Sequence, residues 1–406
     1  MRRIALLLGL LTVSVGVHGG ARGDATEPLA SPAGTSSGMY NLATGGDGRV
    51  YLSWIDPAET GGHALRFSRL GERGWEPARD VVRGTGWFVN WADHPSVTAV
   101  SSGRLFAHWL EHTGAKTGVY GYAIHVRTST DGGRTWADTF DEGTRNVKDY
   151  SGFLTFLPAR DQVHAAFLTP LAPDDHPMPD AHEHDHVKTF GIVTLGPDGR
   201  PRSREIVDSS TCSCCSTDMT MTSAGPVAVY RDRDAGEVRD ISIVRSVRGT
   251  WTAPAPVHRD GWVIKGCPTN GPAVAAAGAR VAVTWFTGAR NQPAVHVAFS
   301  EDAGATFGRP IRVDDGTPTG WPDVVMLPSG RTLISWLERT ATGEGEIRMR
   351  EVTATSRGPA IRVAVADAGR ATGIPMMTVS PRGIVVAWRK GGVQTALVRP
   401  AAVPRP

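Results

Sequence analysis

Four cysteines form the most unusual chemical feature of the sequence. Cys212, Cys214 and Cys215 lie within one short segment, and Cys267 follows later in the chain. Thiolates are preferred ligands of soft metal ions, so these residues could hold copper or zinc. Two disulfides are the alternative; four cysteines allow three pairings, and the one that joins Cys214 to its neighbour Cys215 has the poorest geometry. The spacing is not that of a standard CxxC…CxxC site, so both interpretations stay open.

A second group of possible metal ligands lies in the segment 174–186. If its end is extended, the two-residue period of a strand places His182, His184 and His186 on one side, where neutral imidazoles could chelate a transition ion. The alternative is a solvated loop insertion. Pro177 and Pro179 favour that irregular loop.

A third group combines a phenol, guanidinium groups and carboxylates. Tyr230, Arg231 and Asp232 are consecutive, and Arg239 follows within the same expected hairpin. A phenol beside a carboxylate can act as a nucleophile, and arginines bind a substrate carboxylate in a forked geometry. A charged hairpin held by ion pairs is the alternative.

The elements that must position these groups are short strands in a regular repeat. An alternating apolar run, a turn that usually contains glycine, and a second strand ending in an aromatic residue recur at intervals of roughly fifty residues. The closing aromatic residues are Trp54, Trp109, Phe167, Tyr230, Trp285, Trp336 and Trp388. This pattern predicts an all-β protein, a β-propeller of four-stranded blades with seven repeats. A six-bladed ring with an irregular terminus is the alternative.

Two eight-residue segments carry a resemblance to a known family. Ser129 to Trp136 reads S-T-D-G-G-R-T-W, and Ser300 to Phe307 is a degenerate copy that keeps the Ser, Asp, Gly, Thr and a final aromatic residue. The Asp can cap backbone N–H groups, and Gly takes the left-handed position of the turn. Both segments resemble the Asp-box, or BNR repeat, of the sialidase superfamily. In that family the box is a structural turn away from the active site, so the resemblance implies a propeller and assigns no catalytic residue.

The resemblance stops at the active-site motifs. Sialidases begin their first blade with a Phe/Tyr-Arg-Ile-Pro motif, whereas this chain has Met39-Tyr40-Asn41-Leu42 there. In a propeller, the segments before the inner strands and the residues after the second strands gather on one rim of the channel. That rim is richer in carboxylates than in guanidinium groups, a field that repels an anionic sugar and tolerates a neutral glycan.

The rim supplies the remaining candidate residues. We expect an acid from the set Asp93, Asp218 and Asp232 to donate a proton, because burial can raise a carboxyl pKa into the range of a general acid. Tyr230 or a second carboxylate would stand opposite. The polar residues expected to bind a ligand on this rim are Asn90, His94, Glu111, Asn270 and Glu338.

The termini and the composition complete the predicted organisation. Residues 1–21 read as a signal peptide, which predicts a secreted or periplasmic protein. Residues 22–38 form a linker or a ring-closing strand, 39–400 a single propeller domain, and 401–406 a tail. A net charge of +3 gives no case for a nucleic-acid partner, and no later stretch is long and apolar enough to span a membrane. We expect a monomer.

The sequence therefore predicts an exported sialidase-like propeller with a glycan or small-molecule ligand, acting as a glycoside hydrolase at the channel rim. A copper- or zinc-binding propeller that uses the cysteines is one alternative. A non-catalytic propeller that binds a glycan or a protein is another. No cofactor other than these possible metals is expected.

Overall fold

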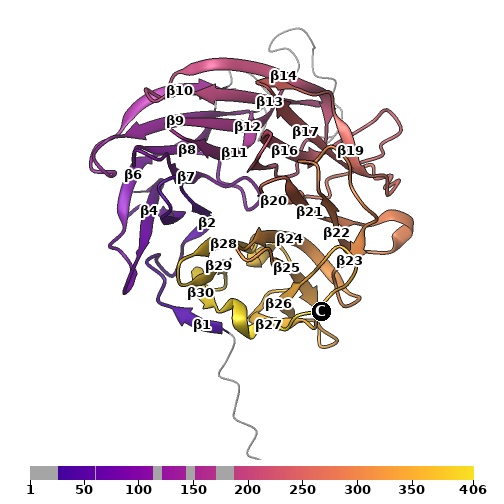
Figure 1. Cartoon of the computed structure of the whole chain (residues 1–406). Coiled ribbons are helices and arrows are strands. Elements are labelled where there is room, and N and C mark those ends of the chain that lie inside the picture. Colours follow the sequence, from indigo (N-terminus) through magenta and orange to yellow (C-terminus); the bar gives the residue numbers. More distant parts are fainter. Residues whose placement is uncertain (1–25, 60, 113–120, 143–150, 171–186) are drawn as a thin grey trace, which may run out of the picture.

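The computed structural model describes residues 26–59, 61–112, 121–142, 151–170 and 187–406. Seven antiparallel sheets stand around a central opening, and the chain passes through them in order around the ring (Figure 1). The predicted seven-bladed propeller is confirmed, and the six-bladed alternative is wrong. The described residues include no helix that is both long and apolar enough to cross a bilayer.

Each blade has four main strands, numbered here from the channel outward. The first three blades are β2 (Gly38–Thr44), β3 (Val50–Pro57), β4 (His63–Gly71) and β6 (Arg79–Gly84); β7 (Ser96–Ala99), β8 (Leu105–His112), β9 (Tyr122–Ser129) and β10 (Ala137–Glu142); and β11 (Gly152–Ala159), β12 (Gln162–Pro170), β13 (Lys188–Leu195) and β14 (Pro201–Thr211). Blades 4 and 5 are β15 (Asp218–Thr222), β16 (Gly225–Arg231), β17 (Ile241–Val247) and β19 (Ala255–His258); and β20 (Ala273–Ala277), β21 (Arg280–Thr287), β22 (Ala294–Ser300) and β23 (Ile311–Arg312). Blades 6 and 7 are β24 (Pro318–Met326), β25 (Thr332–Arg339), β26 (Gly345–Glu351) and β27 (Ile361–Ala366); and β28 (Met376–Ser380), β29 (Gly383–Arg389), β30 (Val393–Val398) and β1 (Thr26–Leu29). Short pieces complete the list: β5 (Gly74–Trp75), β18 (Thr250–Trp251) and the 3₁₀ turns η1 (Ala289–Asn291), η2 (Arg370–Thr372) and η3 (Pro400–Ala402).

The seventh blade joins the two ends of the described chain. Its three C-terminal strands lack a fourth, and β1 supplies it by pairing antiparallel with β30 (Figure 1). The Thr395 hydroxyl donates to the Leu29 carbonyl at 3.0 Å, which fixes this pairing from the side-chain level. The segment that the sequence left as a linker or a ring-closing strand thus includes a strand at Thr26–Leu29.

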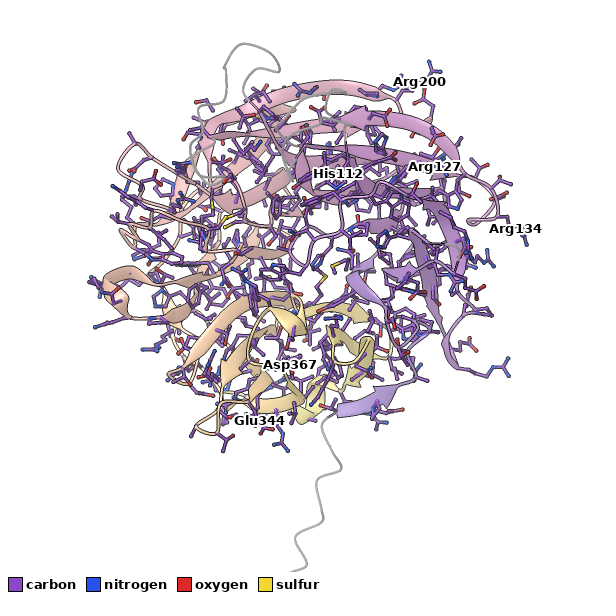
Figure 2. All side chains as sticks on the ribbon, turned by 180° about the vertical axis from the view of Figure 1, so that it is seen from behind. His112, Arg127, Arg134, Arg200, Glu344 and Asp367 are labelled. Atoms are coloured by element: carbon purple, nitrogen blue, oxygen red, sulfur yellow. A yellow bond between two sulfur atoms is a disulfide. The ribbon has the colours of Figure 1, made fainter. Side chains whose placement is uncertain are left out.

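Two turns between third and fourth strands share one hydrogen-bond pattern. In the β9–β10 turn, the Asp131 carboxylate accepts from the Ser129 and Thr135 hydroxyls and from the Thr135 backbone N–H, at 2.7 to 3.0 Å. Asp302 does the same in the β22–β23 turn with Ser300 and Thr306. Arg134 in the first turn lies at the outer edge of the ring, far from the central channel (Figure 2).

The aromatic residues that close the second strands pack between blades. Trp54, Trp285 and Trp336 are among the largest fully buried side chains of the described residues. Where an acidic residue follows two positions later, it lies on the same side of the strand and accepts the indole N–H. The pairs are Trp54 with Asp56 at 2.8 Å, Trp109 with Glu111 at 3.4 Å, and Trp336 with Glu338.

This pairing corrects the expectation that Glu111 and Glu338 bind a ligand on the rim. Glu338 is buried and also accepts from the Thr317 backbone N–H at 2.7 Å. Its carboxylate is committed to holding β25 and the loop before β24. The acidic residues at this register therefore satisfy buried indoles, which explains why they recur.

The register also provides a matched pair of variants. Trp388 closes the seventh blade, but Lys390 follows it in place of an acid, and its buried indole N–H has no partner among the described residues. We expect Trp336→Phe to lower the free energy of unfolding by about 2 kcal/mol or more, because it opens space and removes a donor from a buried carboxylate. Trp388→Phe removes an unpaired donor and should cost clearly less. Urea denaturation of both variants checks this, and equal losses would show that the indole–carboxylate bond adds nothing.

Candidate functional site

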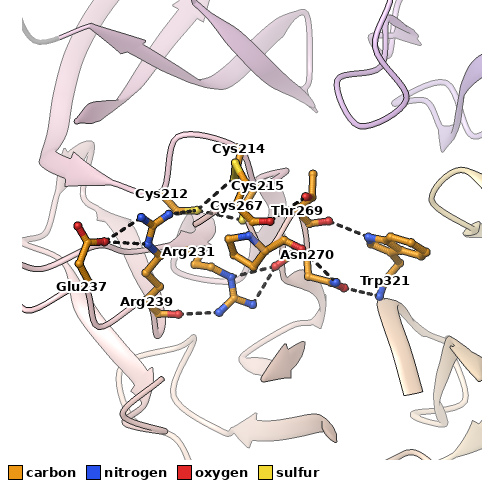
Figure 3. The surroundings of a disulfide bond; sticks show 11 residues. Cys212, Cys214, Cys215, Arg231, Glu237, Arg239, Cys267, Thr269, Asn270 and Trp321 are labelled. Carbon is orange, nitrogen blue, oxygen red and sulfur yellow. Dashed lines mark hydrogen bonds and ion pairs between the residues drawn. A yellow bond between two sulfur atoms is a disulfide. The ribbon is translucent and has the colours of Figure 1, made fainter. Parts of the chain in front are cut away.

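The cysteines lie at the junction between blades 3, 4 and 5. Cys212, Cys214 and Cys215 precede β15, and Cys267 lies in the loop before β20. A disulfide joins Cys214 to Cys267 with a Cα–Cα distance of 5.9 Å, so it ties the loop into blade 4 to the loop into blade 5 (Figure 3). Cys212 and Cys215 are free and buried. The centre therefore matches neither expectation in full, since it has one disulfide and two thiols.

The two thiols face each other beside the disulfide. The Sγ atoms of Cys212 and Cys215 are 3.1 Å apart, and Cys212 Sγ is 3.8 Å from Cys214 Sγ. The Sγ atoms of Cys212, Cys214 and Cys215 all lie within 4.8 Å of one another, and in the described part of the chain no His, Asp or Glu joins this group.

Guanidinium groups surround the thiols. Arg239 is buried and donates to Cys212 Sγ at 3.4 Å, while its other nitrogens hold Glu237 at 2.8 and 3.3 Å (Figure 3). Burial alone would raise the pKa of Cys212, but the hydrogen bond with Cys215 and the charge of Arg239 outweigh it and lower that pKa to about 6. Burial and the neighbouring Cys212 raise the pKa of Cys215.

Arg231 has a structural role instead of the substrate-binding one expected from the sequence. Its guanidinium donates to the backbone carbonyls of Asn270, Arg239 and Phe286 at 2.6 to 3.0 Å. It also stacks on the Trp262 ring, with 4.8 Å between the guanidinium carbon and the ring centroid. Arg231 and Arg239 are thus already bonded within the protein, and neither presents a free fork to a substrate carboxylate.

Tyr230 is likewise engaged inside the fold. Its ring is fully buried against Phe190, and its hydroxyl donates to Asp208 at 2.5 Å. Burial and the charge of Asp208 raise the pKa of this phenol, the opposite of what a nucleophile requires. Asp232 accepts from the Ser242 hydroxyl at 2.8 Å, and burial raises its pKa. These residues form the internal bonds of blade 4, so we do not retain Tyr230 as a nucleophile.

Asn270 and Asn90 stabilise the loops that carry them. The Asn270 side-chain oxygen accepts the Trp321 backbone N–H at 2.6 Å, which links the loop before β20 to β24 (Figure 3). The Asn90 side-chain oxygen accepts from the Ala92 N–H at 2.9 Å. His182, His184 and His186 lie outside the described residues, as does the predicted signal peptide.

The central channel is the second place where polar groups converge. It encloses a cavity of about 390 Å³ lined by the innermost strand of every blade. Three carboxyl groups reach it, and each bonds to the next blade. Asp93 accepts the Phe153 N–H at 2.9 Å, Asp218 accepts the Val274 N–H at 2.8 Å, and Asp323 accepts the Met377 N–H at 2.6 Å.

The channel carboxyl groups have shifted proton affinities. Burial raises the pKa of Asp93 and of Asp218 to about 7, although backbone N–H groups oppose the shift. Burial raises the pKa of Asp323 to about 6, and its charge adds to the shift of Asp218. Two of these three residues belong to the predicted acid set; Asp323 does not, although its place at the start of an inner strand is the signal that could have found it.

Aromatic and imidazole groups lie where the inner strands begin. The rings of Trp91 and Trp321, from opposite sides of the ring of blades, meet edge to face with centroids 5.4 Å apart. His94 lines the channel and bonds to the Trp91 carbonyl at 2.6 Å, and burial lowers its pKa. The imidazole is therefore neutral at pH 7.

No family model matches this chain, and no curated protein matches its sequence. Among solved structures, it is similar to the BP39L lectin from Burkholderia pseudomallei, with a TM-score of 0.58 and 10% identity over 90% of this chain and 97% of the lectin. It is also similar to the polysaccharide lyase Uly1, with a TM-score of 0.51 and 10% identity over 88% of this chain and 91% of the lyase.

Sialidases are also among these structural neighbours. The Hadza microbial sialidase Hz136 matches with a TM-score of 0.43 and 17% identity over 74% of this chain. The chain covers 63% of that sialidase's length, which is less than two thirds. At these identities the comparisons show the propeller fold alone.

The channel carboxyls predict a specific pH dependence of stability. Their pKa is raised above the value of about 3.9 in an unfolded chain, so the folded protein holds more protons between about pH 4 and pH 7. Their contribution to stability is present at low pH and is lost as pH rises through the folded pKa of about 7. We expect Asp218→Asn to reduce this loss, by about 1.4 kcal/mol for each pKa unit removed.

The measurement is the free energy of unfolding at pH 5 and at pH 8 for parent and variant. Asn can accept only one of the two backbone N–H groups, so a constant loss is expected at both pH values, and the difference between them carries the test. Asp161→Asn, in the exposed turn between β11 and β12, is the control. An unchanged pH difference in Asp218→Asn would contradict the raised pKa.

Proposed function

We propose that this protein is an exported carbohydrate-binding propeller that holds a neutral saccharide, or the end of a neutral glycan, in its central channel. The observation that carries the proposal is the 390 Å³ cavity, whose size is within the range of small-molecule sites. Its walls combine hydroxyl and carboxyl groups with apolar side chains, and sugars present both hydroxyl and C–H surfaces.

The polar part of the lining can exchange hydrogen bonds with hydroxyl groups. It includes the carboxyl groups already described and the side chains of Asn41, Thr98, Thr217 and Thr220. A carboxyl group with a pKa near 7 is partly protonated at neutral pH, so it can donate as well as accept. Met219, Met376 and Met377 supply adaptable apolar surface on the same walls.

The charge of the lining favours a neutral sugar over sialic acid. Among the described residues that line the cavity there is no Lys or Arg, and His94 is neutral. An anionic sugar would meet carboxylates with no cation to balance it. Arg231 and Arg239, the arginines expected to bind such a sugar, are held by internal bonds.

The lectin and lyase neighbours support a carbohydrate ligand by analogy of fold only. The disulfide supports export, since such bonds persist in oxidising compartments. Glycoside hydrolysis would need the neutral form of one channel carboxyl group as its acid, and Asp93 and Asp218 are the residues with that property.

The first experiment is a glycan array that includes neutral and sialylated glycans, followed by calorimetry on the best ligand. Thr220 lines the cavity and has no side-chain hydrogen bond among the described residues, so Thr220→Phe should fill the channel and abolish binding with the fold intact. Met221→Phe, one residue on at a side chain that is 40% exposed, should bind as the parent does.

The outcomes separate the candidate functions. Neutral-glycan binding that Thr220→Phe removes supports the proposal, and product release that Asp218→Asn abolishes would extend it to hydrolysis. Preference for sialylated glycans, or binding that survives Thr220→Phe, would place the ligand elsewhere and refute a channel site.

A further inference from the structure

Cys212 and Cys215 are reactive groups that the proposed function does not use. They stand at C-x-x-C spacing, and their Sγ atoms are 3.1 Å apart, a short separation for an S–H···S hydrogen bond. Such a pair most readily exists as one thiolate and one thiol that share a proton. The opposite directions of their pKa shifts agree with this.

The neighbouring disulfide holds the two thiols in place. Cys214 lies between them in the sequence, and its bond to Cys267 anchors that residue to the adjacent loop. The turn must therefore direct Cys212 and Cys215 toward each other on the other side (Figure 3). A donor pair fixed in this way loses little conformational entropy when it binds an ion.

The charges around the pair favour thiolates. Arg239 contacts Cys212 directly, and the charge of Arg231 acts on both thiols. Glu237 is shared between Arg239 and Arg233, so one carboxylate faces these guanidinium groups. A positive environment of this kind offsets the negative charge of two thiolates around one monovalent cation.

The number of donors selects the ion. Structural zinc needs four ligands, but Cys214 and Cys267 are joined to each other, and among the described residues no His, Asp or Glu lies close enough to complete a zinc set. Two thiolates alone satisfy Cu(I), which accepts soft ligands at low coordination number.

We propose that Cys212 and Cys215 bind one Cu(I) ion as a buried two-thiolate site while the Cys214–Cys267 disulfide stays intact. Cu(I) forms a bond to each sulfur, and the thiol protons pass to solvent; no electron is transferred. Both sulfurs are buried, so the bound ion is shielded from water. This site is independent of the channel and of any glycan.

The test uses the full-length protein purified without reductant and kept anaerobic. Thiol titration after denaturation should give two free thiols, and competition with the Cu(I) chelator bicinchoninate should show one tightly bound ion. Cys212→Ser and Cys215→Ser should each abolish that binding. Met221→Leu, which removes an exposed sulfur elsewhere, should bind as the parent does.

X-ray absorption at the copper edge of the loaded parent protein should show two sulfur neighbours, a result that does not depend on whether the serine variants fold. Absence of free thiols would show that Cys212 and Cys215 form a second disulfide and would overturn the site. Coordination by three or four sulfurs, or stoichiometric Zn²⁺ binding, would show that the disulfide opens and would also overturn it. Stoichiometric Cu(I) binding by folded serine variants would place the ion elsewhere.

Discussion

The innermost strand of each blade has one edge that no other strand covers, so its backbone N–H groups must find partners across the channel wall. Asp93, Asp218 and Asp323 provide these partners at three junctions, where a carboxyl group of one blade accepts an N–H of the next. At another junction, Thr217 donates to the Phe153 carbonyl. The polar channel follows from this requirement, because the groups that join the blades are also the groups that a ligand would meet.

The architecture could be predicted because the features that specify it are local in sequence. The repeat of turn, strand and closing tryptophan sets the blade count, and the inner strands begin within a few residues of the predicted positions. The Ser129 and Ser300 segments form the turns that their residues indicate. The meaning of the acidic residues after the tryptophans was missed. Their role depends on which side of a strand the Trp336 indole and the Glu338 carboxylate share.

The candidate site could be predicted only in its location. Sequence spacing places the cysteines and Arg231 on the same rim, but it does not show that Arg231 spends its donors on three carbonyls. Nor does it show that Tyr230 meets Asp208, which lies on an earlier strand. The pairing of Cys214 with Cys267 needed the structure as well, since sequence alone left three pairings open. Contacts between distant segments decided each role.

The strand β1 closes the seventh blade against β30, and this has a consequence for the order of folding. The contact between Glu27 and Arg399 joins residues 372 positions apart, so the last blade cannot form until nearly the whole chain is present. Closing such a long loop is slow and has a high entropic cost. Once formed, the same blade holds both ends, so neither end can peel away without breaking a sheet that the other end shares. The ring is therefore expected to close late and, once closed, to open slowly.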